Sequence, residues 1–141
     1  MKAVYITLVI FFLLGVACGS QSVKNNKDLD DNMLDMMMYH DNLGLFLRKG
    51  DADYASWLLE GMDSSLQVIS RKFTTHRKLR DPFTSHYEKL LEPPISAIRA
   101  SLKNNDIPGA ITAYKRLTKN CNSCHANHEV NKEVFDRTLP E

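Results

Sequence analysis

Apolar residues recur every three or four positions along most of this 141-residue chain, which is the spacing of amphipathic α-helices. The pattern predicts four helical segments: residues 32–49, residues 51–75, residues 83–103, and a last segment that opens at Asp106. The sequence has no convincing run of alternating apolar and polar residues of the kind that predicts a half-buried strand. Short connections between such helices favour antiparallel packing, so we expect an all-α fold, an antiparallel four-helix bundle.

Capping residues and prolines support these boundaries. Asp51 or Asp53 can cap the second segment, and Asp106 can cap the fourth, which has Pro108 in its first turn. The third segment contains Pro93 and Pro94. Because neither proline donates a backbone hydrogen bond, the pair must kink or split that helix.

The first 17 residues have a different character. Lys2 supplies one positive charge, and an apolar run over residues 3–16 follows it. This layout is typical of a secretory signal peptide, and the run is short for a membrane span. Residues 14–18, Leu-Gly-Val-Ala-Cys, resemble a bacterial lipobox, in which the cysteine is acylated and becomes the first mature residue. The alternative is ordinary signal cleavage nearby.

We therefore expect residues 1–17 to be a lipoprotein-type signal peptide and Cys18 to be lipidated. Residues 18–31 are then a flexible tether, since residues 21–31 are polar and rich in Lys, Asn and Asp. The expected location is outside the cytoplasm, facing the periplasm, with the protein lipid-anchored to a bacterial membrane. Acylation also accounts for the odd third cysteine of the chain.

Charge and length narrow the class of protein further. Removal of residues 1–17 takes away Lys2 and no acid, which leaves 17 basic against 17 acidic residues. This balance gives no indication of a nucleic-acid partner. The remaining 124 residues suit a single domain with one core.

Residues 121–125, Cys-Asn-Ser-Cys-His, form a C-x-x-C-H run, the spacing of covalent c-type haem attachment. The thiols of Cys121 and Cys124 lie three residues apart, so both can reach the two vinyl groups of one porphyrin. His125 then supplies the proximal ligand of the haem iron. The expected cofactor is one covalently bound haem c, and the cofactor would carry the chemistry.

Two other kinds of functional site, a redox dithiol and a zinc site, are built from similar residues. A thioredoxin-like dithiol needs a βαβ context, which the sequence around this motif lacks. A zinc site needs four well-placed ligands. Cys121, Cys124 and either His125 or His128 could contribute, but no second C-x-x-C or H-x-H cluster faces them in the sequence. We expect His128 to pack near the haem edge, and His86 to lie at the surface.

The position of the motif carries a resemblance to a known family. It closes the last predicted helix, with Tyr114 seven residues and Leu117 four residues before the first cysteine. This arrangement resembles the class II c-type cytochromes, which are the cytochrome c-prime family and its low-spin relatives. The resemblance implies a four-helix-bundle cytochrome domain over residues 32–136, with haem near its C-terminal end and a tail at residues 137–141.

The resemblance also implies a place for the distal iron ligand, on the first helix. In this family a methionine there gives six-coordinate iron, and an apolar residue leaves an open site. Alignment on Leu43-Gly44 places Met33 at the ligand position, whereas alignment on Lys49-Gly50 places Leu34 there.

Met33 is the preferred candidate, because it shares the inward stripe of the first helix with Met37, His40 and Gly44. Met37, one turn on, is the next candidate, and the distal position has no protein ligand if Leu34 occupies it. His40, two turns from Met33, is a weaker candidate for the distal ligand, and we expect it instead to be a buried histidine with its hydrogen bonds satisfied. Gly44 would permit close approach of backbone or haem.

A monohaem c-type cytochrome that acts as a membrane-tethered periplasmic one-electron carrier, and not as an enzyme, is therefore the expected function. The expected partners are redox proteins at the membrane surface and, through the acyl anchor, the lipid bilayer. A homodimer through the first helix is implied by analogy alone. The alternative is a five-coordinate haem protein that binds a small gas such as nitric oxide.

Overall fold

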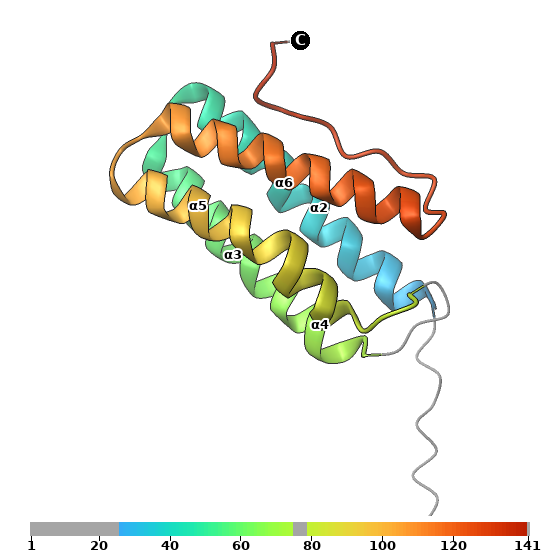
Figure 1. Ribbon diagram of the computed structural model, residues 1–141. Coiled ribbons are helices and arrows are strands. Elements are labelled where there is room, and N and C mark those ends of the chain that lie inside the picture. Colours follow the sequence, from blue (N-terminus) through green and yellow to red (C-terminus); the bar gives the residue numbers. More distant parts are fainter. Residues whose placement is uncertain (1–25, 75–78, 141) are drawn as a thin grey trace, which may run out of the picture.

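The structure, a computed structural model, describes residues 26–74 and 79–140, with the backbone alone for residues 26–28. In these ranges the chain forms an all-helical bundle (Figure 1), which confirms the predicted helical class. Helix α2 spans Asn26–Lys49, α3 spans Ala52–Lys72, α4 spans Phe83–His86, the π-helix η1 spans Tyr87–Leu91, α5 spans Glu92–Lys103 and α6 spans Ile107–Asn127. The expected signal peptide, Cys18 and residues 19–25 lie outside the described residues.

Each long helix packs against two others. Helix α2 packs against α3 and α6, and α5 packs against the same two helices (Figure 1). The core between them consists mainly of aliphatic side chains, among them Leu43, Leu47, Ile69, Ile95, Ile98 and Leu117. Burial of one such side chain stabilises the fold by about 1.5–3 kcal/mol.

Helix α2 begins at Asn26, six residues before the expected start at residue 32. Residues 26–31, which we expected to be part of the tether, are therefore helical. Two properties of this turn favour the longer helix. Leu29 is buried against the core, and the exposed Asp30 and Asp31 place negative charge near the positive end of the helix dipole.

The proline pair splits the third predicted segment into α4, η1 and α5. Ahead of Pro93 and Pro94 the helix widens, and Glu92 donates its N–H to the carbonyl of Tyr87, a π-helical bond. Because Pro94 has no N–H, the carbonyl of Leu90 lacks its usual helical donor. The side-chain amide of Asn120 on α6 donates to that carbonyl at 2.6 Å instead. The expected interruption is thus confirmed, and α6 compensates for it.

The predicted N-caps of the second and fourth segments are both confirmed. The carboxylate of Asp51 accepts from the backbone N–H of Tyr54 at 3.0 Å, and that of Asp106 accepts from the backbone N–H of Gly109 at 2.9 Å.

In the described part of the chain, no helix is long and apolar enough to cross a membrane.

Beyond α6 the chain turns back and runs alongside that helix (Figure 1). We call residues 130–139 the C-terminal strap. Side-chain hydrogen bonds attach it to the bundle: Lys132 to His125 of α6, Val134 to Asn122 of α6, Arg137 to Asp41 of α2, and Leu139 to Arg48 of α2. The last two attachments involve residues that we expected to lie in or beside a tail.

Candidate haem site

A single pocket brings the predicted site residues together. Cys121, Cys124 and His125 of α6 line it together with Met33 and Met37 of α2. Its empty volume is about 1070 Å³, which includes the part open to solvent. Apolar side chains make up much of the remaining lining: Leu29, Leu34, Met36, Leu79, Phe83, Val130 and Val134. A largely apolar pocket with a few convergent polar groups is typical of a cofactor site.

The two cysteines of the motif are thiols and not thiolates. Cys121 is buried and Cys124 is half-buried, and neither forms a disulfide within the described residues. Burial, with a smaller contribution from nearby Cys124, raises the pKa of Cys121 to about 12, and burial raises the pKa of Cys124 as well. A catalytic dithiol needs a lowered thiol pKa, so this environment argues against a thioredoxin-like site.

His125 is held in one orientation by the strap. Its Nδ1 lies 2.8 Å from the backbone carbonyl oxygen of Lys132. Since a carbonyl can only accept, Nδ1 must carry the proton and donate. The neutral ring then has its lone pair on Nε2, the nitrogen available to a metal. The structure therefore fixes the tautomer that an iron ligand requires.

The Lys132 carbonyl owes its position to the attachment of the strap. The Asn122 side chain pairs with both backbone groups of Val134: its Nδ2 donates to the carbonyl at 2.9 Å, and its Oδ1 accepts from the N–H at 2.8 Å. Asn122 is the second residue of the motif. Asn122, one of the two residues between the cysteines, thus positions the segment that orients the histidine after them.

Met33 and Leu34 both line the pocket but differ in burial. Met33 is partly buried and packs against the core, whereas 56% of Leu34 is exposed. Met37 is also partly buried, and Met38 points away with 58% exposed. Met33 and Met37 are therefore both placed to offer a thioether to the pocket.

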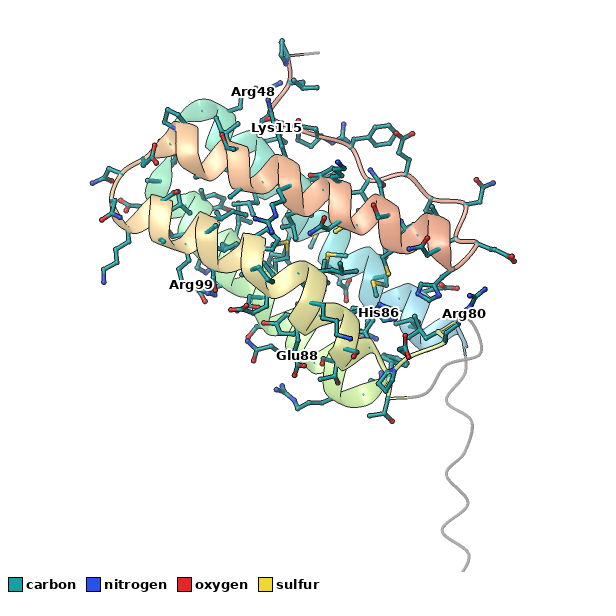
Figure 2. All side chains as sticks on the ribbon, viewed as in Figure 1. Arg48, Arg80, His86, Glu88, Arg99 and Lys115 are labelled. Atoms are coloured by element: carbon teal, nitrogen blue, oxygen red, sulfur yellow. The ribbon has the colours of Figure 1, made fainter. Side chains whose placement is uncertain are left out.

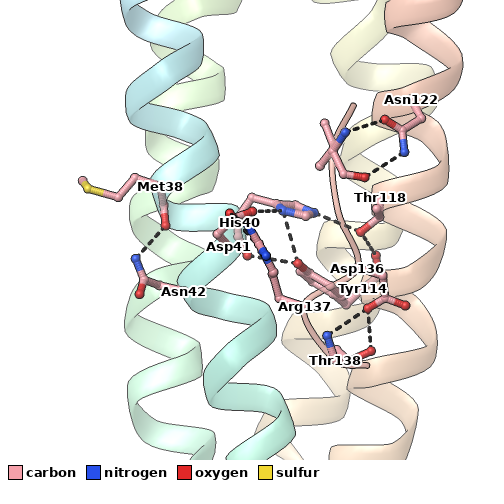
Figure 3. Close-up of polar contacts among 11 residues, drawn as sticks. Met38, His40, Asp41, Asn42, Tyr114, Thr118, Asn122, Asp136, Arg137 and Thr138 are labelled. Carbon is pink, nitrogen blue, oxygen red and sulfur yellow. Dashed lines mark hydrogen bonds and ion pairs between the residues drawn. The ribbon is translucent and has the colours of Figure 1, made fainter. Parts of the chain in front are cut away.

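His40 is buried and its ring nitrogens are bonded, as we expected. Its Nε2 lies 2.9 Å from the Thr118 hydroxyl oxygen, and its Nδ1 lies 3.2 Å from the Tyr114 hydroxyl oxygen (Figure 3). Thr118 donates its own proton to the Tyr114 carbonyl at 3.1 Å, so it accepts from His40. These bonds hold α2 to α6 beneath the pocket and make His40 a structural residue.

Gly44 permits a close approach, but the group that approaches is the Tyr114 side chain and not backbone or haem, as we had expected. A Cβ atom at Gly44 would lie 2.5 Å from the Tyr114 hydroxyl oxygen, which no real side chain tolerates. Burial raises the pKa of the Tyr114 phenol well above its ordinary value. Glycine at this place therefore allows a neutral tyrosine to reach His40 across the helix interface.

His86 is the site residue that the sequence did not predict. We expected it at the surface, but its ring packs edge-on against His128 with centroids 5.0 Å apart. Burial and the nearby His128 lower the pKa of His86, which keeps its ring neutral near pH 7. Its ligand atom, the Cys124 Sγ and a ring nitrogen of His128 all lie within 4.8 Å of one another. A histidine from outside the motif therefore faces it.

Comparison of the chain with protein-family models, with curated proteins and with solved structures gave no significant match.

Proposed function

We propose that this protein is a monohaem c-type cytochrome that carries one electron at a time and is not an enzyme. The observation that supports this most is the shared pocket, where the C-x-x-C-H residues of α6 meet methionines of α2. The donor set suits haem c: two thiols for the vinyl groups, an imidazole with Nε2 free, and a thioether from a second helix. In the sequence, the C-x-x-C-H run near the end of the last helix resembles the arrangement of class II c-type cytochromes.

The chain's own residues have distinct roles in this proposal. Cys121 and Cys124 form the two thioether bonds, and His125 provides the proximal nitrogen. Met33 provides the distal sulfur, which raises the reduction potential and closes the iron to small molecules. The haem supplies an iron that changes oxidation state by one electron. The apolar lining excludes water, and burial of this kind also tunes the potential.

The proposed setting is the periplasmic face of a bacterial membrane. An acyl anchor on Cys18 would hold the protein beside its redox partner proteins and leave the bundle accessible to them. Multiple acyl chains are needed for stable anchoring, as a single chain binds only marginally.

A second candidate is a five-coordinate haem protein that binds a small gas such as nitric oxide. One observation favours it: Leu34 lines the same pocket as Met33. If Leu34 faces the distal side of the haem, no protein sulfur reaches the iron, and the sixth position is open. The distal ligand therefore decides between electron transfer and gas binding.

The test is a comparison of Met33→Ala with wild type. In the haem-loaded wild type we expect the near-infrared band of methionine–iron ligation and little binding of carbon monoxide to the reduced protein. Met33→Ala should lose the band and bind carbon monoxide readily. Met38→Ala is the matched control, because Met38 lies on the same helix with 58% of its side chain exposed, and it should behave as wild type.

Two outcomes contradict the Met33 assignment. If Met33→Ala keeps the band and Met37→Ala loses it, the ligand is one turn further along α2. If the wild type is already high-spin and binds carbon monoxide readily, the gas-binding function replaces electron transfer.

A further inference from the structure

Three potential metal ligands converge where α4 ends beside the end of α6. His86 is the last residue of α4, Cys124 lies in the last turn of α6, and His128 follows that helix. One ligand atom from each lies within 4.8 Å of the other two. Figure 2 labels His86 in this part of the bundle. All three side chains are half-buried, so an ion can enter from solvent.

An unsatisfied atom points to a ligand at this place. The Nε2 of His86 is buried and has no hydrogen-bond partner among the described residues. A buried polar atom without a partner costs about 1–3 kcal/mol, so native structures rarely keep one without a reason. No described residue supplies a hydrogen bond to this atom, so a bound ligand would satisfy it.

We propose that the haem-free protein binds one zinc ion through His86, Cys124 and His128. One thiolate and two imidazoles are ligands that zinc takes in tetrahedral sites, and water fills the fourth position. Ligand atoms in such a site are roughly 3.3–3.7 Å apart, given metal–ligand bonds of about 2.0–2.3 Å. Small side-chain rotations therefore close the cluster. The Cys124 proton leaves to solvent as the thiolate binds the ion.

This site and the proposed haem site share Cys124, so they exclude each other. A thioether has no thiolate charge to offer, and haem attachment at Cys124 would release the ion. The mutual exclusion of zinc and haem rests on the proposed function. The zinc site itself needs only the side chains of His86, Cys124 and His128. Until haem is attached, zinc would also keep Cys124 from pairing with Cys121, which is three residues away.

The test is titration of the reduced, haem-free protein with Co²⁺ and then with Zn²⁺. We expect one Co²⁺ per chain, with tetrahedral visible bands and a sulfur-to-cobalt band in the near ultraviolet, both displaced by one equivalent of Zn²⁺. His86→Ala should weaken binding by roughly tenfold or more, and Cys124→Ser should abolish the sulfur band. His86→Gln, with circular dichroism of both variants, separates loss of a ligand from loss of the fold.

His125→Ala and Cys121→Ser are the controls that discriminate. Neither residue belongs to the cluster, so both variants should bind Co²⁺ as wild type does. Two results would overturn the proposal. In the first, His86→Ala and His86→Gln bind Co²⁺ as tightly as wild type. In the second, His125→Ala weakens Co²⁺ binding as much as the His86 variants do, which would mean that the C-x-x-C-H run holds the ion. Haem attachment is measured separately on matured protein, so zinc binding without haem attachment counts against the proposed function alone.

Discussion

Asp41 is the residue that links the buried histidine of α2 to the C-terminal strap. Its Oδ2 accepts from the Arg137 guanidinium at 2.9 and 3.1 Å, and its Oδ1 lies 3.4 Å from the Nδ1 of His40. The contact with His40 and the hydrogen bonds from Arg137 lower the pKa of Asp41, although its partial burial opposes them. The ionised carboxylate therefore stabilises the attachment of the strap.

The first residue-scale prediction is a loss of stability in acid. The pKa of Asp41 in the folded protein lies below its ordinary value of 3.8. The ionised carboxylate therefore makes its full contribution to the free energy of unfolding above pH 3.8, and this contribution is lost as the pH falls through the folded pKa. Thermal unfolding followed by circular dichroism should show wild type losing more stability than Asp41→Asn across that acidic window. Asp35→Asn, an exposed acid on the same helix, should follow wild type. Equal acid sensitivity of wild type and Asp41→Asn would contradict this role.

The residues of the candidate site could be predicted only in part. The ligand set of Cys121, Cys124 and His125 follows from the C-x-x-C-H spacing, which can be recognised in the sequence without knowledge of the fold. The position of His86 does not follow from local spacing, because it depends on how α4 packs beside the end of α6. The partner of the His125 Nδ1 could not be predicted either, since the Lys132 carbonyl is placed by a strap without regular structure.

At the scale of elements, the strap is the part of the fold that acts most directly on the site. It lies over α6, contributes Val130 and Val134 to the pocket, and orients His125 through the Lys132 carbonyl. Removal of one attachment should therefore change the site without unfolding the bundle.

The element-scale prediction is the effect of Asn122→Ala. This change removes both hydrogen bonds to Val134, a buried residue, and should lower the free energy of unfolding by about 1–3 kcal/mol. Amide exchange at Val134 should accelerate, and in haem-loaded protein the reduction potential should shift as His125 loses its fixed orientation. Asn127→Ala, an exposed change near the end of α6, is the control. An unchanged potential together with faster exchange would mean that the strap is structural only.

The helices were largely predictable, and the exceptions have local causes. Apolar periodicity and the caps at Asp51 and Asp106 set the middle boundaries correctly. The early start of α2 was missed because residues 26–31 are mostly polar, and only one of them, Leu29, is buried against the core. The π-helix was missed because the proline pair predicts an interruption but not the wider helical form that precedes it.

At the scale of the whole molecule, the account joins an exported, anchored N-terminus to a haem bundle. The N-terminus lies outside the described residues, so its role stays a prediction from sequence. If residues 1–17 are removed, 17 basic and 17 acidic residues remain, and this balance gives no indication of binding through bulk electrostatics.

The whole-molecule prediction concerns membrane attachment through Cys18. Wild type expressed in a bacterial host should fractionate with membranes and incorporate labelled fatty acid, whereas Cys18→Ser should be released to the soluble fraction or remain unprocessed. Ser20→Ala, a change just beyond the lipobox-like run, should leave attachment intact. A soluble wild type whose mature sequence begins after Cys18 contradicts this prediction.

Covalent haem attachment is the central claim, and the intact mass of matured protein tests it most directly. The protein is expressed with its signal sequence and a cytochrome c maturation system, and then extracted with acid acetone. The account predicts a mass increase of one haem that survives extraction, weakened by Cys121→Ser or Cys124→Ser and lost in the double variant. His125→Ala should lose the proximal ligand. A wild-type mass without haem after maturation would contradict the account.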